Sequence, residues 1–303
     1  MRLSHDKVKA HITEKYVTSM SSTIWIWKQI SGLATRYNDV VYARPMISHS
    51  YKFLVYFGGD IQDFQENMVK HVEKKKYTEW SLNNTADILS HNFPKYHVFV
   101  ICPSRISNLF SCFDNFVKSN NDYGIPTFSP TFNALNNLQE LVRSFCTKLN
   151  TLDMNQDTAT YAPDKVNLTL IAFSKGCVVL NQFLYEFQYY QSQSIPDTSM
   201  INFINNIKSM WWLDGGHGGY KDTWITDRGV LESLAKLKVD IHVHVTPYQI
   251  EDDSRPWIAT EESSFFNTLQ SLNVPTQRTV HFQNKPRSII MHFNILKIIK
   301  EET

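Results

Sequence analysis

The sequence predicts an α/β protein built as one domain around a mainly parallel, doubly wound sheet. Two observations predict this class. Short segments rich in β-branched and aromatic residues alternate with stretches long enough for a crossover helix. One segment, "LTLIAF", runs through a serine directly into an apolar stretch, "GCVVLNQFL". Alternation of this kind places helices on both faces of the sheet, because parallel strands are joined by crossovers.

The expected elements can be given in chain order. Apolar residues with helical spacing follow the expected strand Val166–Phe173, at Val179, Phe183 and Phe187. They also follow the expected strand Lys208–Leu213, at Leu231 and Leu234. We expect an N-terminal extension over residues 1–40 and the α/β domain over residues 41–303. The expected strands are Lys52–Phe57, Tyr96–Ile101, Val166–Phe173, Lys208–Leu213, Val239–Val245 and Arg278–Gln283.

Composition excludes several classes of function. The 303 residues are 42% hydrophobic and 19% charged with a net charge of +1, which gives no electrostatic reason to expect nucleic acid or an anionic membrane as partner. Four cysteines are spread without a C-x-x-C pair, so a reducing compartment such as the cytoplasm is expected. Because no apolar run approaches about 18 residues, we expect a soluble chain without a membrane span. The oligomeric state is not predicted.

Ser174 is the candidate nucleophile. Ala172-Phe173-Ser174-Lys175-Gly176 fits the small-x-Ser-x-small pattern of a nucleophile elbow, where the chain turns sharply from a strand into a helix. The usual first glycine of the pattern is an alanine in this chain. A serine that merely caps the helix is the simpler alternative. The elbow predicts an α/β-hydrolase-like fold.

The acid and the base should follow the serine in the order Asp or Glu, then His. The loop after Val239–Val245 carries Asp252 and Asp253, and we expect Asp252 to orient the histidine. Arg255 in the same loop is expected to pair with one of the two aspartates. Asp214, directly after an earlier strand, is the alternative acid.

His292 is the expected base because it follows the last expected strand. His217, in the glycine-rich stretch "DGGHGG", and His281, inside the last expected strand, are the competing histidines. The simpler interpretation of His292 is a structural histidine whose ring forms hydrogen bonds at the start of a helix.

Two glycines, Gly58 and Gly59, follow an early strand and predict part of an oxyanion hole. Glycine lets the backbone approach a ligand closely, and in this fold an amide from that loop pairs with the amide after the nucleophile, which is Lys175. The alternative is an ordinary strand-to-helix turn capped by Asp60.

No metal or cofactor is expected. His242 and His244 alternate on one strand face but lack a clear third ligand, so we interpret them as buried histidines. Neither a dinucleotide fingerprint nor a phosphate loop occurs in the chain.

Four segments in order resemble a known family: "YFGGDIQDF", "FSKGCVVLNQFLYE", "WWLDGGHGG" and "HVTPYQIEDDSRPWI". The resemblance runs from about Tyr51 to the C-terminus and is to the family of the human chromosome-two open-reading-frame sixty-nine protein. It implies an α/β-hydrolase-like, serine-hydrolase-like protein associated with mitochondria. It also implies that Ser174, Asp252 and His292 occupy the positions of a triad, and it names no substrate.

Two classes of function remain open. The first is a serine hydrolase that cleaves an ester, thioester or amide through Ser174, His292 and Asp252. The second is a catalytically inactive hydrolase-fold protein that acts in binding or scaffolding, because fold does not determine function.

Overall fold

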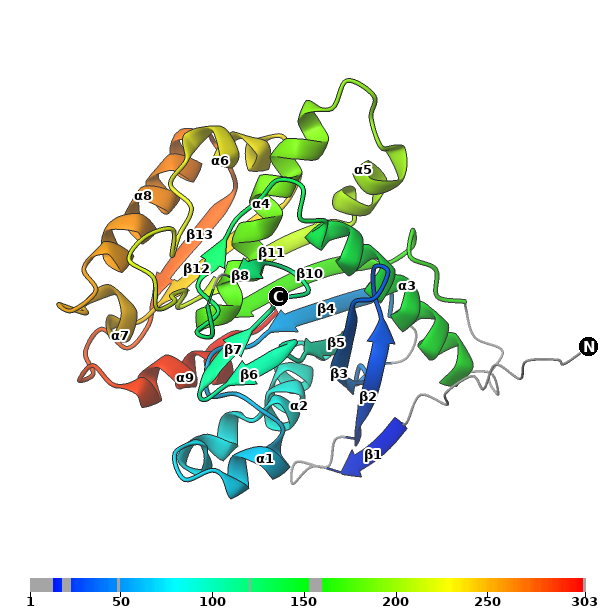
Figure 1. The fold of residues 1–303 in the computed structure, drawn as a ribbon, viewed down its shortest axis with the longest axis horizontal. Helices are drawn as coiled ribbons and strands as arrows, with labels where there is room; N and C mark the ends of the chain where they lie inside the picture. Colours follow the sequence, from blue (N-terminus) through cyan, green and yellow to red (C-terminus); the bar gives the residue numbers. More distant parts are fainter. Residues whose placement is uncertain (1–12, 18–22, 48–49, 120, 153–159, 302–303) are drawn as a thin grey trace, which may run out of the picture.

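A single nine-stranded sheet forms the centre of the molecule. The computed structural model describes residues 13–17, 23–47, 50–119, 121–152 and 160–301. The strand order is β1-β2-β3-β5-β4-β10-β11-β12-β13, parallel from β5 to β13 and antiparallel from β1 to β5 (Figure 1). The strands of this sheet are β1 (Thr13–Val17), β2 (Thr23–Ser31), β3 (Tyr37–Ala43), β4 (Lys52–Phe57), β5 (Tyr96–Ile101), β10 (Asn167–Phe173), β11 (Ile207–Leu213), β12 (Asp240–Val245) and β13 (Thr276–Val280).

The sequence-based strands agree with this sheet, apart from the last one. Five of the six expected segments match a strand to within one residue at either end. The sixth was expected at Arg278–Gln283, whereas β13 ends at Val280. It ends there because Val280 pairs with Val245, the last residue of β12. His281 therefore follows the strand rather than lying inside it.

Helices cover both faces of the sheet (Figure 1). Side chains that alternate along β4 enter different cores: Phe53, Val55 and Phe57 pack on one face, and Leu54 and Tyr56 on the other. On the first face lie α3 (Ala134–Leu152), α4 (Cys177–Ser192), α5 (Thr198–Asn205), α6 (Arg228–Ala235) and α8 (Trp257–Ser271). On the second lie α2 (Leu82–Asn92), α9 (Ile289–Ile298) and the end of the 3₁₀ helix η1 (Lys74–Trp80), with α1 (Gln65–Lys70) beside η1.

The sheet starts earlier in the chain than the expected boundary at residue 40. That boundary falls inside β3, and β2 pairs with β3 in the same sheet. The side chains of β2 contribute to both cores, Ile24 and Ile26 to one and Trp27 and Ile30 to the other. From residue 23 onward, the chain is therefore part of the α/β domain, while residues 1–12 lie outside the described part.

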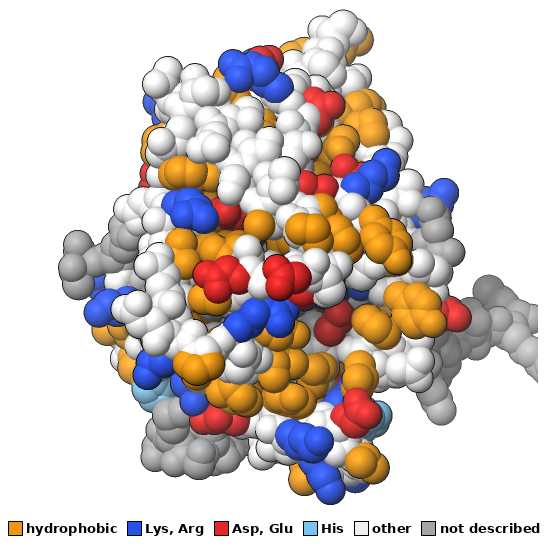
Figure 2. Space-filling model, turned by 90° about the vertical axis from the view of Figure 1, so that its left-hand side faces the viewer, with side chains coloured by type: hydrophobic (Ala, Val, Ile, Leu, Met, Phe, Trp, Pro, Cys, Tyr) orange, Lys and Arg blue, Asp and Glu red, His pale blue; other side chains and the backbone are white. Residues whose placement is uncertain are grey.

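The carboxyl ends of the parallel strands meet at one edge of the sheet, the left-hand side of Figure 1. Figure 2 looks onto this edge and shows acidic and basic side chains together near its middle, with hydrophobic side chains around them. The short 3₁₀ helix η2 (Ser174–Gly176) and the helix α7 (Pro247–Ile250) lie at this edge, directly after β10 and β12. No helix of the described residues is long and apolar enough to cross a membrane.

Two small hairpins follow β5 and lie against this edge. They are β6 (Arg105–Ser107) with β7 (Phe110–Cys112), and β8 (Lys118–Ser119) with β9 (Pro126–Thr127). The first is bonded to the loop after β4, where the Ile61 amide donates to the Leu109 carbonyl over 2.7 Å. We call residues 105–127, without the undescribed residue 120, the cap.

A substitution at Gly176 tests how tightly the carboxyl ends of β4 and β10 pack against each other. A Cβ at this position would lie 2.2 Å from the Phe57 carbonyl oxygen, which is a backbone atom of a central strand. Gly176→Ala is expected to lower the free energy of unfolding by about 1–3 kcal/mol or more, as overpacking does elsewhere. Urea denaturation measures this change in the free energy of unfolding. The control is Gly218→Ala, where nothing lies within 4 Å of the added Cβ, with an expected change within about 0.5 kcal/mol. Equal stability of the two variants would contradict this packing.

Candidate active site

Ser174 lies at a strained turn at the carboxyl end of β10, between β4 and β11. Its φ is +53°, a left-handed conformation that costs a non-glycine residue about 1–3 kcal/mol. A Cβ on Gly59 would lie 2.8 Å from the Ser174 Cβ, so the loop after β4 runs directly beside the serine. This is the geometry expected of a nucleophile elbow at a central strand with the glycine pair nearby.

His292 is held by Asp214. Its Nδ1 lies 2.6 Å from Asp214 Oδ2, and both side chains are buried. Asp214 directly follows β11 and has a φ of +49°. The Thr246 amide donates to its Oδ1 over 2.8 Å, and the Thr246 hydroxyl donates to its Oδ2 over 2.5 Å. The Asp214 carboxylate thus takes part in three hydrogen bonds, with the Thr246 amide, the Thr246 hydroxyl and His292 Nδ1, and it pairs with no lysine or arginine of the described residues. Because a carboxylate accepts hydrogen bonds, this contact keeps the proton of His292 on Nδ1.

The histidine ring is also positioned by packing. His292 is the fourth residue of α9, whose first turn is capped by Ser288. The ring of Phe173 lies 4.4 Å from the imidazole centroid, and the ring of Tyr248 lies 4.7 Å away. Because Phe173 immediately precedes Ser174, this contact brings the base next to the elbow. Within the described residues, no hydrogen bond joins the Ser174 hydroxyl to His292; catalytic bonds of this kind are often long without substrate.

Asp252, the acid expected from the sequence, has a different set of contacts. Its Oδ2 pairs with Arg255 and with Arg287, each over 2.8 Å, and Ser254 donates to its Oδ1 over 2.6 Å. Burial raises its pKa, but the hydrogen bonds from Ser254 and Arg255 outweigh burial and hold it at about 2. The geometry thus replaces Asp252 with Asp214 as the partner of His292. Asp253 is exposed.

The sequence did not single out the carboxylate that contacts His292, because two loops carry suitable aspartates. Asp214, which makes this contact, follows β11, one strand earlier than the loop of Asp252. A usable signal was present: Asp214 directly follows the buried run Met210–Leu213 and precedes two glycines, as a residue at a tight strand end would. The arginine near Asp252 was expected to pair with an aspartate, and that pairing is confirmed.

The competing histidines have other partners. His217 accepts from the Gly219 amide over 3.0 Å at Nδ1, and its Nε2 lies 3.2 Å from the Asp222 carbonyl. Burial lowers the pKa of His217 to about 4, so it is neutral at physiological pH. His281 lies 2.8 Å from His244, ring nitrogen to ring nitrogen. Neither histidine contacts Asp214 directly.

The expected oxyanion donors need one change. The Gly59 amide donates to Gln62 Oε1 over 2.8 Å, so it is already bonded. The next amide, that of Asp60, donates to no acceptor among the described residues. Lys175 is the second residue of η2, which continues into α4, and amides in the first turn of a helix lack intrahelical acceptors. The amides of Asp60 and Lys175 are therefore the candidate oxyanion donors. Gly59 brings the backbone close to Ser174, whereas a Cβ on Gly58 would meet Gln62 and Leu82.

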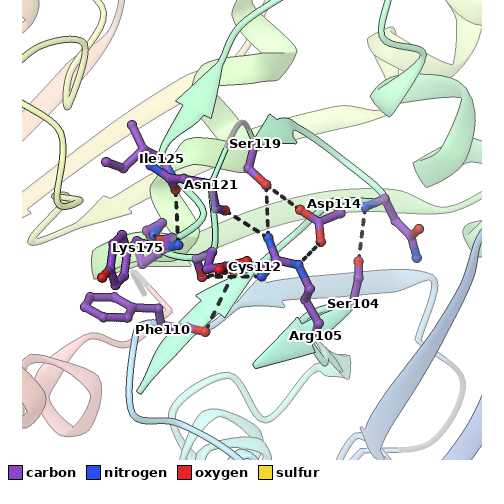
Figure 3. Close-up of polar contacts among 12 residues, drawn as sticks. Ser104, Arg105, Phe110, Cys112, Asp114, Ser119, Asn121, Ile125 and Lys175 are labelled. Carbon is purple, nitrogen blue, oxygen red and sulfur yellow. Dashed lines mark hydrogen bonds and ion pairs between the residues drawn. The ribbon is translucent and has the colours of Figure 1, made fainter. Parts of the chain in front are cut away.

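The cap is fastened over this region by one arginine and one lysine (Figure 3). Arg105 pairs with Asp114 over 2.7 Å and donates to the carbonyls of Asn121 and Asp122. Lys175, which is buried, donates from Nζ to the Tyr123 carbonyl over 2.5 Å. Because Lys175 directly follows Ser174, the cap is tied to the turn that carries this serine.

The two histidines of β12 stack on the ring of Trp211. Trp211 lies 3.9 Å from His242 and 5.1 Å from His244 between ring centroids. In the described part of the chain, no group of three or more His, Cys, Asp or Glu side chains is placed to hold a metal ion. These contacts support their interpretation as packed histidines.

The mainly parallel sheet, the helices on both faces and the sharp turn at Ser174 define the α/β-hydrolase fold class. The chain belongs to the C2orf69 family, whose model matches residues 27–162 and 146–275. The mouse protein "Mitochondrial protein C2orf69 homolog" is 36% identical over 287 residues, covering 81% of this chain and 77% of that protein. The human "Mitochondrial protein C2orf69" is 35% identical, covering 81% and 73%. The resemblance and the fold predicted from the sequence are both confirmed.

Solved structures with a similar arrangement are hydrolases of low sequence identity. An S-formylglutathione hydrolase from Agrobacterium tumefaciens aligns with a TM-score of 0.46 and 9% identity, covering 95% of this chain and 96% of that one. The esterase Est22 aligns with a TM-score of 0.43 and 11% identity, covering 95% and 76%.

The bond between His292 and Asp214 can be observed in solution. Such a short, buried N–H···O⁻ bond protects its proton from exchange, so His292 should give a resolved imidazole proton resonance far downfield of the amide region. We expect that resonance to vanish in Asp214→Ala and to persist in Asp252→Ala. Proton NMR of the two variants and the parent protein measures it. Loss of the resonance in Asp252→Ala alone would reverse the assignment.

Proposed function

We propose that this protein is a serine hydrolase that cleaves an ester, thioester or amide bond. The observation that carries the proposal is the bond from His292 Nδ1 to the buried Asp214 carboxylate, beside a serine with a φ of +53°. A buried aspartate that fixes one tautomer of a histidine, next to a strained serine, is the arrangement that activates a hydroxyl group. Ser174, His292 and Asp214 are the proposed triad.

In the proposed reaction, the Ser174 hydroxyl attacks the carbonyl carbon and its proton passes to His292 Nε2. Asp214 accepts the Nδ1 proton as a hydrogen bond and stabilises the imidazolium that forms. The amides of Asp60 and Lys175 are the proposed donors to the oxyanion. His292 then protonates the leaving group, which departs. Water attacks the acyl-enzyme with His292 acting as base, the acyl group leaves as the free acid, and His292 returns a proton to Ser174. The chain supplies every catalytic group in this scheme, and water is the second reactant.

A binding role without turnover is the second candidate. The observation that favours it is the cap, which leaves Ser174 only 9% exposed and is tied to Lys175. A hydrolase would have to admit its substrate past these contacts, whereas a scaffolding protein would not.

We infer a mitochondrial location from the relatives, which carry that word in their names. The cytoplasm is the alternative, and fractionation of cells that express the tagged chain distinguishes the two compartments.

Labelling by a fluorophosphonate probe tests the nucleophile. The probe reacts with an activated serine hydroxyl, so the parent protein should be labelled at Ser174 and Ser174→Ala should not be labelled. Ser199→Ala, an exposed serine on α5, is the control and should label like the parent. Mass spectrometry locates the adduct. A folded parent protein that takes up no label would favour the binding role.

Asparagine substitutions test the acid. Asp214→Asn should lower ester turnover by about 10⁴-fold, because the asparagine no longer holds the histidine tautomer that accepts the serine proton. Asp252→Asn, at the same edge of the sheet, is the matched control and should keep turnover within a few-fold. Turnover of an aryl ester and melting temperature are measured together. If Asp252→Asn lost activity at unchanged stability while Asp214→Asn kept it, the proposed triad would be wrong.

A further inference from the structure

Asp60 is a carboxylate beside the nucleophile that the triad does not use. It directly follows Gly59, whose Cα lies against the Ser174 side chain. Burial raises the pKa of Asp60, while the Lys175 ammonium and the hydrogen bond from the Ser111 amide oppose that rise. The carboxyl group therefore lies near Lys175, the residue that directly follows Ser174.

Asp60 is half-buried, and few hydrogen bonds reach its carboxylate. Its Oδ1 accepts one hydrogen bond, from the Ser111 amide over 2.8 Å. Among the described residues, no lysine, arginine or histidine nitrogen lies within 4.0 Å of it. The neighbouring cation, Lys175, instead donates to the Tyr123 carbonyl. Because Asp60 keeps part of its surface exposed and pairs with no cation of the described residues, a positively charged ligand can reach this carboxylate and form a charge-assisted hydrogen bond with it.

The position of Asp60 limits where that partner comes from. A scissile carbonyl carbon has to lie at Ser174 Oγ, with its oxygen near the amides of Asp60 and Lys175. The Asp60 side chain then reaches only substrate atoms within a few bonds of that carbon. A negative charge there opposes formation of the oxyanion unless the substrate carries a positive charge at the same place.

We propose that Asp60 binds an ammonium group next to the scissile carbonyl, so that the preferred substrates are aminoacyl esters, thioesters or amides. This inference rests on the proposed serine hydrolase function and deepens it. The ammonium supplies the cation that Asp60 lacks, while the Ser111 amide holds the carboxylate in place. Lys175 lies on the cap side, where its ammonium donates to the Tyr123 carbonyl and leaves Asp60 unpaired.

A matched pair of substrates tests the proposal. L-alanyl and isobutyryl esters of one fluorescent phenol differ only by an ammonium in place of a methyl group. The parent protein should favour the alanyl ester in kcat/KM by about tenfold or more, as expected for a charge-assisted hydrogen bond in an enclosed site. Asp60→Asn keeps the backbone amide and an acceptor for Ser111, and it should reduce this ratio about tenfold or more. Asp253→Asn, an exposed aspartate at the same edge, should leave the ratio unchanged.

Two results would overturn the proposal. One is a parent protein with no preference for the alanyl ester. The other is an Asp60→Asn variant that slows both esters equally, since the carboxylate would then act on His292 rather than on the substrate.

A binding measurement separates this proposal from the proposed catalysis. Ser174→Ala is titrated with L-alaninamide and with isobutyramide, and chemical shifts are followed by NMR. We expect alaninamide to bind more tightly, and the difference to disappear in Ser174→Ala/Asp60→Asn. If no ester is turned over and no probe is bound, the proposed catalysis fails, while selective alaninamide binding still supports the role of Asp60. Equal binding of the two amides would overturn that role.

Discussion

The close approach of two strand ends, those of β4 and β10, is the constraint on which the site depends. There is no room for a Cβ at Gly176 against the Phe57 carbonyl, or at Gly59 against Ser174. This contact forces the turn in which Ser174 adopts a left-handed conformation. It also places the loop that carries Asp60 beside the turn that carries Ser174 and Lys175. A strained residue persists only where its surroundings overdetermine it, and in this protein the surroundings are two buried parallel strands.

The acid and base depend on the same sheet through a second set of contacts. Asp214 is held by its own amide, which donates to the His244 carbonyl over 2.7 Å, and by Thr246 of the next loop. The carboxylate is therefore fixed by β11 and β12 together, and α9 has only to deliver His292 to it. Packing of Phe173 on the imidazole links this pair back to the elbow. Asp252, in contrast, joins two arginines on a half-exposed loop, where its charge is satisfied without the histidine.

The sequence predicted what local patterns encode. Segments rich in β-branched and aromatic residues, separated by stretches long enough for a crossover helix, predicted the parallel strands β4 and β10. The residues Ala172 to Gly176 predicted the turn between β10 and α4. Two features could not be predicted in this way. The choice between Asp214 and Asp252 is made by contacts with Thr246 and Arg287, which lie far along the chain. The bond from Gly59 to Gln62, which moves the available amide to Asp60, depends on a side-chain conformation that no spacing reveals.

The cap explains why the polar groups beside Ser174 have few partners. The Ser111 amide of hairpin β6–β7 donates to Asp60, and the Tyr123 carbonyl accepts from Lys175. Asp60 and Lys175 are therefore each hydrogen-bonded to a backbone group and do not form an ion pair with one another. Arg105 fixes both segments from the outer side of the cap through Asp114 and the carbonyls near residue 121. A charge held by a single dipole remains available to a ligand, whereas a closed ion pair would first have to be broken. The cap thus keeps Asp60 and Lys175 apart, and this separation lets the carboxylate accept a positive group from a substrate.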